Sequence, residues 1–400
     1  MRALRRIGIP LALLAGGALG TWLALPRLAA MAFIVRVAKT DGLPGRLARL
    51  FAGEVEPGPL ISLPTRHGAL PARLYRPAGP VRRTAILLPG LHRDGIHEER
   101  LVGLASELAA SGVQALTIAP PDLTRYRITT ATTDQIEDAI AWAAQRRDLA
   151  PDGRVAVMGV SFAGGLALVA AGRPAVRDHV AYVLSFGGHG DLLRVLRYLC
   201  AGSTAELTPE LRALAAGGEH VHVPKPHDYG GVVALLNLAD RILPAEQVAP
   251  LAYAITVFLE ASSIDRLDHE GARAHFARAR ALADHLPEPA RALMGYVNER
   301  DVQGLGQALG PLLANLDLPA ALSPDRSPSP TAPVFLLHGA DDPVVPASEM
   351  LLLARELRQT TPVHAFASRL ITHAEANRGV ALAEMWRLAG FWRAMLAPPP

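Results

Sequence analysis

A serine stands where the pattern of the chain changes abruptly. Residues 154–160 form an almost wholly apolar run, and a helix-like pattern of small residues begins directly after Ser161. Gly159 and Ala163, two positions before and two after the serine, leave room for a tight turn from a strand into a helix. Such a turn, a nucleophile elbow, lifts the serine hydroxyl out of the sheet. The alternative is an ordinary turn with a surface serine, because Ala163 stands where glycine is commoner.

The chain downstream of this serine offers the two partners that a serine nucleophile needs. A serine hydroxyl attacks a carbonyl only when a base takes its proton and a third group orients that base. The stretch LLHGADDPVVP places the acids Asp341 and Asp342 just past an apolar run. The stretch SRLITHAEA places His373 after another strand-like segment. These residue types predict nucleophilic catalysis at Ser161.

Apolar strand-like segments alternate with amphipathic helical segments around the serine. A hairpin of two antiparallel strands is expected first, within 60–77. The later strands are expected at 84–90, 113–120, 154–160, 180–188 and 334–339. This alternation predicts an α/β fold with a doubly wound, mostly parallel sheet. Ser161 then lies at the carboxyl end of a central strand, where open α/β sheets place their sites.

The alternation stops after Asp191. Residues 192–322 read as helices and loops, and a Pro/Ser-rich stretch at 323–333 leads into the next strand. An insertion of this length is too long for a loop, so we expect a helical cap over the sheet. The predicted division is a first part of the core at 59–191, the cap at 192–322 and a second part of the core at 323–400.

Together these motifs resemble the α/β-hydrolase superfamily across residues 59–398. The stretch HGADDPVVP at 338–346 is similar to the H-G-x-x-D-x-x-V-P signature of that superfamily, and this register places Asp342 at the acid position. His373 follows ahead of a C-terminal helix, as the resemblance implies. The segment Pro89-Gly90-Leu91 stands where the superfamily usually has His-Gly in its oxyanion loop.

The resemblance implies a catalytic triad of Ser161, Asp342 and His373. It also implies an oxyanion hole made by the backbone N–H groups of Leu91 and Phe162. No metal and no organic cofactor is required for this chemistry. The sequence therefore predicts a serine hydrolase that cleaves a small or lipid-like acyl ester. The alternatives are an acyltransferase or peptidase with the same triad, or an idle binding protein that keeps the fold.

Several of these site assignments have rivals in the sequence. Asp341 is the neighbouring register, and Asp191 follows an expected strand after which some members of the superfamily carry their acid. His364 competes with His373 but lies inside a strand-like segment, where it is expected to pack. His338 is expected to form a structural hydrogen bond at the end of a strand.

Other polar residues have no assigned role. The stretch HVHVPKPHD holds His220, His222, His227 and Asp228, which are residue types that bind metals, but a solvated cap loop is the better interpretation. His92 follows the oxyanion segment and is a candidate for the pocket wall. The single cysteine, Cys200, excludes an intrachain disulfide and a metal site built from cysteines.

The N-terminus carries an apolar run without charge at residues 7–26. At 1.5 Å per residue, such a run is long enough to cross a bilayer. We expect a single-pass membrane anchor within 1–36, with the catalytic domain outside the cytoplasm and separable from its anchor. The alternative is a signal peptide cleaved after Ala32 and a secreted enzyme. A net charge of +3 over 400 residues, without a basic run interleaved with aromatics, argues against nucleic acid as a partner.

Overall fold

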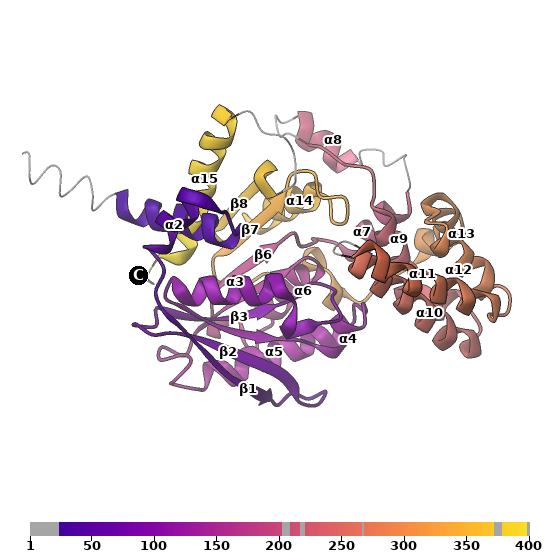
Figure 1. Ribbon diagram of the computed structural model, residues 1–400, viewed down its shortest axis with the longest axis horizontal. Coiled ribbons are helices and arrows are strands. Elements are labelled where there is room, and N and C mark those ends of the chain that lie inside the picture. The colour runs from indigo at the N-terminus through magenta and orange to yellow at the C-terminus, as the bar shows by residue number, and fades with distance from the viewer. Residues whose placement is uncertain (1–23, 202–208, 217–220, 266–267, 372–377, 398–400) are drawn as a thin grey trace, which may run out of the picture.

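The computed structural model describes residues 24–201, 209–216, 221–265, 268–371 and 378–397. Within these residues one sheet of eight strands runs through the molecule in the order β1-β2-β4-β3-β5-β6-β7-β8 (Figure 1). The strands are β1 (Val55–Leu63), β2 (Leu70–Pro77), β3 (Arg83–Leu88), β4 (Val113–Ile118), β5 (Val155–Val160), β6 (Val180–Phe186), β7 (Val334–Gly339) and β8 (Val363–Ser368). β1 pairs with β2 and β2 with β4 in antiparallel fashion, and the remaining neighbours are parallel. The predicted mostly parallel sheet is confirmed.

The central strands are apolar throughout because helices cover both faces of the sheet. Alternate side chains of a strand point to opposite faces. Ile86 and Leu88 therefore join one core, which includes α5 and α6, while Leu87 joins the other, which includes α3 and α15. The helices outside the cap are α2 (Gly42–Arg49), α3 (Glu99–Ala110), α4 (Pro121–Thr124), α5 (Thr130–Ala144), α6 (Phe162–Gly172), α14 (Ala347–Leu357) and α15 (Arg378–Leu396).

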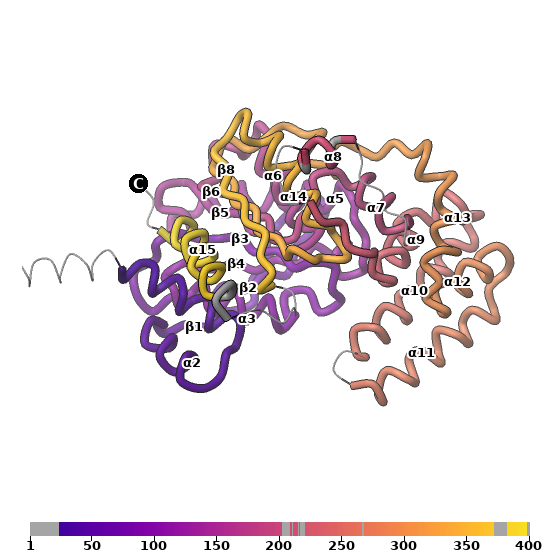
Figure 2. The backbone as a smooth tube through the Cα atoms, turned by 90° about the horizontal axis from the view of Figure 1, so that it is seen from above, coloured from indigo at the N-terminus to yellow at the C-terminus, as the bar shows by residue number. Residues whose placement is uncertain are grey.

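The chain between β6 and β7 forms a body of helices beside the carboxyl end of the sheet (Figures 1 and 2). Its helices are α7 (Leu192–Cys200), α8 (Pro209–Ala216), α9 (Asp228–Ile242), α10 (Ala245–Asp265), α11 (His269–Asp284), α12 (Ala290–Asn298) and α13 (Val302–Asn315). Among the described residues, α10 is the one helix long and apolar enough to cross a membrane. Leu251, Ile255 and Phe258 of α10 are buried within the helical body. Its apolar sequence is therefore explained by the core of the cap.

The first described segment, a helix over residues 24–37, packs onto the α3 and α15 side of the sheet. Phe33 is fully buried, with its ring centroid 4.7 Å from that of Trp392. The Arg36 guanidinium lies 2.6 Å from Glu107 and donates to the carbonyl of Ala48 at 3.1 Å. Residues 30–36 thus pack against the domain, so we now expect that removing residues 1–36, which the sequence predicts to be a separable anchor, would expose part of this core. Of the apolar run at 7–26, all but the last three residues lie outside the described residues.

Candidate active site

Ser161 occupies a strained turn between β5 and α6. Its backbone has φ 56° and ψ −136°, a conformation that side-chain-bearing residues rarely adopt. An added Cβ at Gly159 would collide with the backbone carbonyl of Ala163, so glycine is required there. The Ala163 side chain is fully buried and fits without obstructing the turn. The nucleophile elbow therefore forms with Ala163 at the position where glycine is commoner.

Neighbouring strand ends hold the serine in place. The Ser161 N–H donates to the carbonyl of Phe186 at 2.7 Å, and the Ser161 carbonyl accepts from Gly164 at 2.8 Å. A Cβ added at Gly90 would lie 3.2 Å from the Cβ of Ser161, so the loop after β3 approaches the elbow closely. These hydrogen bonds and the close approach of the loop hold the backbone of Ser161 in its strained conformation.

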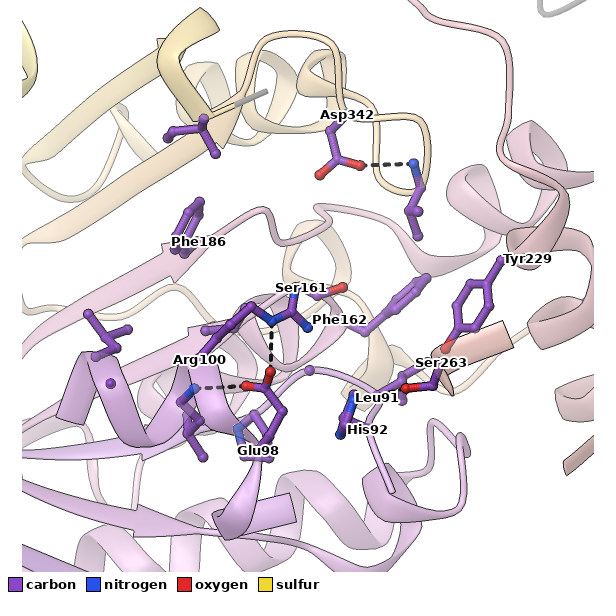
Figure 3. Close-up of a pocket in the computed structure, with 18 of the residues that line it drawn as sticks. Leu91, His92, Glu98, Arg100, Ser161, Phe162, Phe186, Tyr229, Ser263 and Asp342 are labelled. Atoms are coloured by element: carbon purple, nitrogen blue, oxygen red, sulfur yellow. Dashed lines mark hydrogen bonds and ion pairs between the residues drawn. The ribbon is translucent and has the colours of Figure 1, made fainter. Parts of the chain in front are cut away.

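The two expected oxyanion donors border the serine. Phe162 is the first residue of α6, and an N–H in the first turn of a helix has no acceptor within that helix. Leu91 follows Gly90 in the loop after β3 and lines the same cavity as Ser161. Figure 3 shows Leu91 and Phe162 beside Ser161. The positive end of the α6 dipole also faces this point.

Asp342 lies in the loop between β7 and α14 and faces the same cavity. Its Oδ1 accepts the N–H of Val344 at 2.8 Å and that of Val345 at 3.1 Å, which fixes the carboxylate. Figure 3 shows one of these two hydrogen bonds. Oδ2 lies 3.9 Å from Nε2 of the buried His338. Two backbone donors on one oxygen leave the other oxygen to orient a partner.

His338 anchors this loop from below. Its Nε2 lies 2.7 Å from the carbonyl oxygen of Val345, as the expected structural role requires. Burial lowers the pKa of His338, which favours the neutral ring with its N–H donated to that carbonyl. His338 therefore holds the acid loop through its hydrogen bond to Val345.

The strand order, the strained serine after β5, the acid loop after β7 and the helical insertion between β6 and β7 form one recognisable arrangement. This is the α/β-hydrolase fold. The recognition made from the motifs is confirmed at the level of the fold.

Comparison with solved structures finds esterases and a peptidase. An esterase of Pyrobaculum calidifontis is 15% identical with a TM-score of 0.40, over 94% of this chain and 93% of the esterase. A brefeldin A esterase, described as a bacterial homologue of human hormone sensitive lipase, is 15% identical with a TM-score of 0.41, over 93% and 87%. The acylaminoacyl peptidase of Pyrococcus horikoshii is 13% identical with a TM-score of 0.42, over 90% of this chain and 44% of the peptidase. No family model and no curated protein matches. The fold assignment rests on the strand order and the elbow.

The third expected member of the triad, His373, lies outside the described residues. Ile371, the last described residue before it, lines the cavity that contains Ser161. The rival His364 stacks on Phe335 with ring centroids 4.8 Å apart, which agrees with a packing role in β8.

The two rival acids have other partners. Asp191 caps α7 by accepting the N–H of Arg194 at 2.7 Å. Asp341 lies 3.6 Å from His222 of the cap and is not among the described residues that line the cavity. Of these acids, the structure places Asp342 with Ser161.

The cavity has a volume of about 1000 Å³ and two ends of different chemistry. In Figure 3, Ser161 lies between Phe186 on one side and Tyr229 and Ser263 on the other. The end that we call apolar, beside the helix over 24–37, α3 and α15, is lined by Phe33, Ile34, Val37, Leu104, Leu388 and Trp392. The charged Lys39, Glu98 and Arg100 of the same or adjoining segments also line the cavity. The polar end, under the cap, is lined by His92, Asp228, Tyr229, Ser263, Asp265 and Arg300.

The polar end is held by a network that sequence reasoning did not find. Asp228 Oδ1 lies 2.7 Å from Nδ1 of His227, and this hydrogen bond lowers the pKa of Asp228 to about 2. Arg300 lies 3.3 Å from Asp228. His92 reaches the cap as well, with Nε2 3.4 Å from Oγ of Ser263 on α10. Of these residues, the sequence singled out His92, from its place after the oxyanion loop, and His227 and Asp228 as metal-binding residue types, but it did not indicate their pairing with each other or with Arg300.

The histidine-rich stretch of the cap does not converge on one point. His222 faces Asp341, whereas His227 faces Asp228, and His220 lies outside the described residues. No cluster of three or more metal-binding side chains is found in the part of the chain that the structure describes.

Proposed function

We propose that this protein is a serine hydrolase that cleaves carboxylic esters through an acyl-enzyme. The observation that carries the proposal is the strained Ser161 elbow, packed against the Gly90 loop and sharing a cavity with the backbone-fixed carboxylate of Asp342. Strain of this kind is retained where the surrounding structure holds it for a function.

In the proposed mechanism, His373 takes the proton of Ser161 while the serine oxygen attacks the ester carbonyl. The N–H groups of Leu91 and Phe162 stabilise the oxyanion, each contributing about 3 kcal/mol to the transition state. Asp342 orients the imidazole and stabilises its charged form. His373 protonates the leaving alcohol, and water activated by the same residue then releases the acyl group.

The two ends of the cavity suggest how the substrate lies. The apolar end between α3, α15 and the helix over 24–37 suits an acyl chain, and the polar end under the cap suits the alcohol. We further propose that the apolar run at 7–26 anchors the protein in a membrane, with the catalytic domain outside the cytoplasm. Small or lipid-like esters are the proposed substrates.

Labelling by a fluorophosphonate tests the nucleophile. The wild-type full chain should be labelled and should hydrolyse p-nitrophenyl esters, and Ser161→Ala should lose both properties. Ser263→Ala is the matched control because Ser263 lines the same cavity at its polar end, so this variant should still be labelled. An idle binding protein would remain unlabelled, and labelling that survives Ser161→Ala would refute the assignment. A transferase would be labelled but would release product faster when an alcohol or amine is added.

A further inference from the structure

Large apolar side chains are exposed mainly at one end of the molecule. Of the twelve such side chains among the described residues, three are scattered over β1, the β2–β3 loop and α10. The other nine are Leu25, Leu28, Val37, Leu43, Leu47, Leu50, Phe51, Leu382 and Trp386. They belong to the helix over 24–37, to α2 and the residues directly after it, and to α15. We call these nine residues the N-terminal face.

The helix α2 presents its leucines outward. Leu43, Leu47 and Leu50 recur at intervals of four and three residues, so they share one side of a helix. Leu50 is 79% exposed and Leu43 is 62% exposed, whereas Gly45 and Ala48 on the other side are buried. The side of α2 with Gly45 and Ala48 therefore packs on the domain, and the leucines on the opposite side face away from it.

The three elements of the N-terminal face are joined by direct contacts. Arg36 of the first helix donates to the carbonyl of Ala48 in α2 at 3.1 Å. The Arg27 guanidinium lies 4.8 Å from the ring centroid of Trp386, which joins the same helix to α15. Figures 1 and 2 both place the indigo N-terminal helices and the yellow α15 at the same end of the molecule. The elements that carry these exposed apolar side chains therefore lie together at one end of the molecule.

Charge and sequence indicate what covers this surface. Residues 24–52 contain five basic residues and one acidic residue. The buried Arg36 pairs with Glu107 and Lys39 pairs with Glu99, so the positive charge that this segment offers to a partner is mainly that of its other arginines. Arg46 and Arg49 are exposed on α2 between its leucines. The uncharged run at 7–26 enters the first helix of the same face. Exposed leucine and tryptophan interspersed with arginine are typical of segments that lie in a membrane interface beside anionic headgroups.

We propose that the N-terminal face lies on a lipid bilayer that contains anionic lipids. The cavity opens at the edge of this face: Val37, Ala38 and Lys39 are exposed and line the cavity, and Met385, next to Trp386, lines it too. An ester in the bilayer can then pass its acyl chain into the apolar end without crossing water. This consequence for the substrate rests on the proposed function, whereas the docking of the face does not.

An environment-sensitive probe tests the docking directly. The full chain carrying Leu50→Cys, labelled with a nitrobenzoxadiazole fluorophore, is mixed with vesicles of phosphatidylcholine and phosphatidylglycerol. Cys200 is buried, and the unsubstituted chain shows whether it takes up label. We expect the emission to shift to the blue and to be quenched by spin-labelled lipid. Leu60→Cys is the control, since Leu60 is 60% exposed on β1, outside the face, and its probe should not respond.

Activity gives an independent readout. The double variant Leu47→Glu with Leu50→Glu should hydrolyse a short water-soluble ester at the wild-type rate. It should hydrolyse a long-chain ester embedded in the same vesicles at least about tenfold more slowly, because two leucines no longer enter the interface. Leu60→Glu should leave both rates unchanged.

Three results would overturn the proposal. A Leu50→Cys probe that vesicles do not affect would show that the bilayer does not cover the face. A blue shift without lipid that grows with protein concentration would assign the face to a second copy of the chain. A lipid-free shift that does not depend on concentration would assign it to the apolar run of the same chain. A wild-type chain that does not hydrolyse the short ester would refute the proposed function. The fluorescence of the Leu50→Cys probe would still decide whether the face docks on the bilayer.

Discussion

Replacing Phe33 by alanine tests whether the N-terminal helix is part of the catalytic domain. The Phe33 side chain is fully buried beside Trp392 and also lines the apolar end of the cavity. Truncating a fully buried phenylalanine typically costs 3–5 kcal/mol, because the transfer free energy is lost and a void remains. The Phe33→Ala variant should therefore unfold at a temperature lower by about 4 to 6 °C, because the unfolding entropy of a chain of this length is about 0.8 kcal/mol/K.

The measurement follows thermal unfolding of the full chain in detergent by the fluorescence of its four tryptophans, one of which is Trp392. Val37→Ala is the matched control, since Val37 lies in the same helix but is 37% exposed, and its midpoint should move by less than about 2 °C. Equal shifts for the two variants, or no shift for Phe33→Ala, would show that the helix does not pack on the domain. The boundary of the catalytic domain would then return to residue 37.

Three further predictions concern the site and its supports. Asp342→Asn should lower kcat by up to about 10⁴-fold, because it favours the wrong tautomer of the base, whereas Asp341→Asn should change kcat little. A larger loss of kcat in Asp341→Asn than in Asp342→Asn would assign the catalytic acid to Asp341. Gly159→Ala should abolish folding or activity, because its Cβ would meet backbone, while Gly295→Ala, with open space around its Cβ, should leave both intact. The Asp228 carboxylate, with a pKa of about 2 in the folded chain, stabilises the fold above pH about 4, and this contribution is lost as the pH falls toward 2. The difference in unfolding free energy between wild type and Asp228→Asn should therefore be largest above pH 4 and shrink below it, and a difference that grows on acidification would contradict the assignment.

The sheet and the elbow could be predicted because their signals are local. Each buried parallel strand is a short apolar run bounded by turn residues, and the close approach at Ser161 demands small residues within two positions. The loop carrying Asp342 could also be placed, since the carboxyl ends of parallel strands meet at one edge of the sheet. In the hairpin, β1 begins at Val55, ahead of the predicted start, and its pairing shifts between Pro57 and Leu60.

The N-terminal helix and the polar end of the cavity could not be predicted from local pattern. An apolar segment such as 28–37 looks the same whether it packs in a core or continues an anchor. Its role is decided by Trp392 and Glu107, which are distant in sequence. Asp228 and Arg300 likewise meet only when separate cap segments pack together, and the sequence gives no sign of which of its many charged residues will meet.

The cap leaves and re-enters the core at neighbouring strands, because β6 pairs directly with β7. The returning chain runs along α6, where the carbonyl of Pro328 lies so close to Gly172 that no side chain fits there. An insertion with this geometry can be lengthened, shortened or exchanged without altering the register of the sheet. Cap and core can therefore diverge at different rates, with new leaving groups admitted by changes between α7 and α13 while the serine elbow stays as it is. A chimaera with another cap, joined after α7 so that Arg194 stays paired with the buried Glu349 of the core, should retain the proposed chemistry and change the substrate.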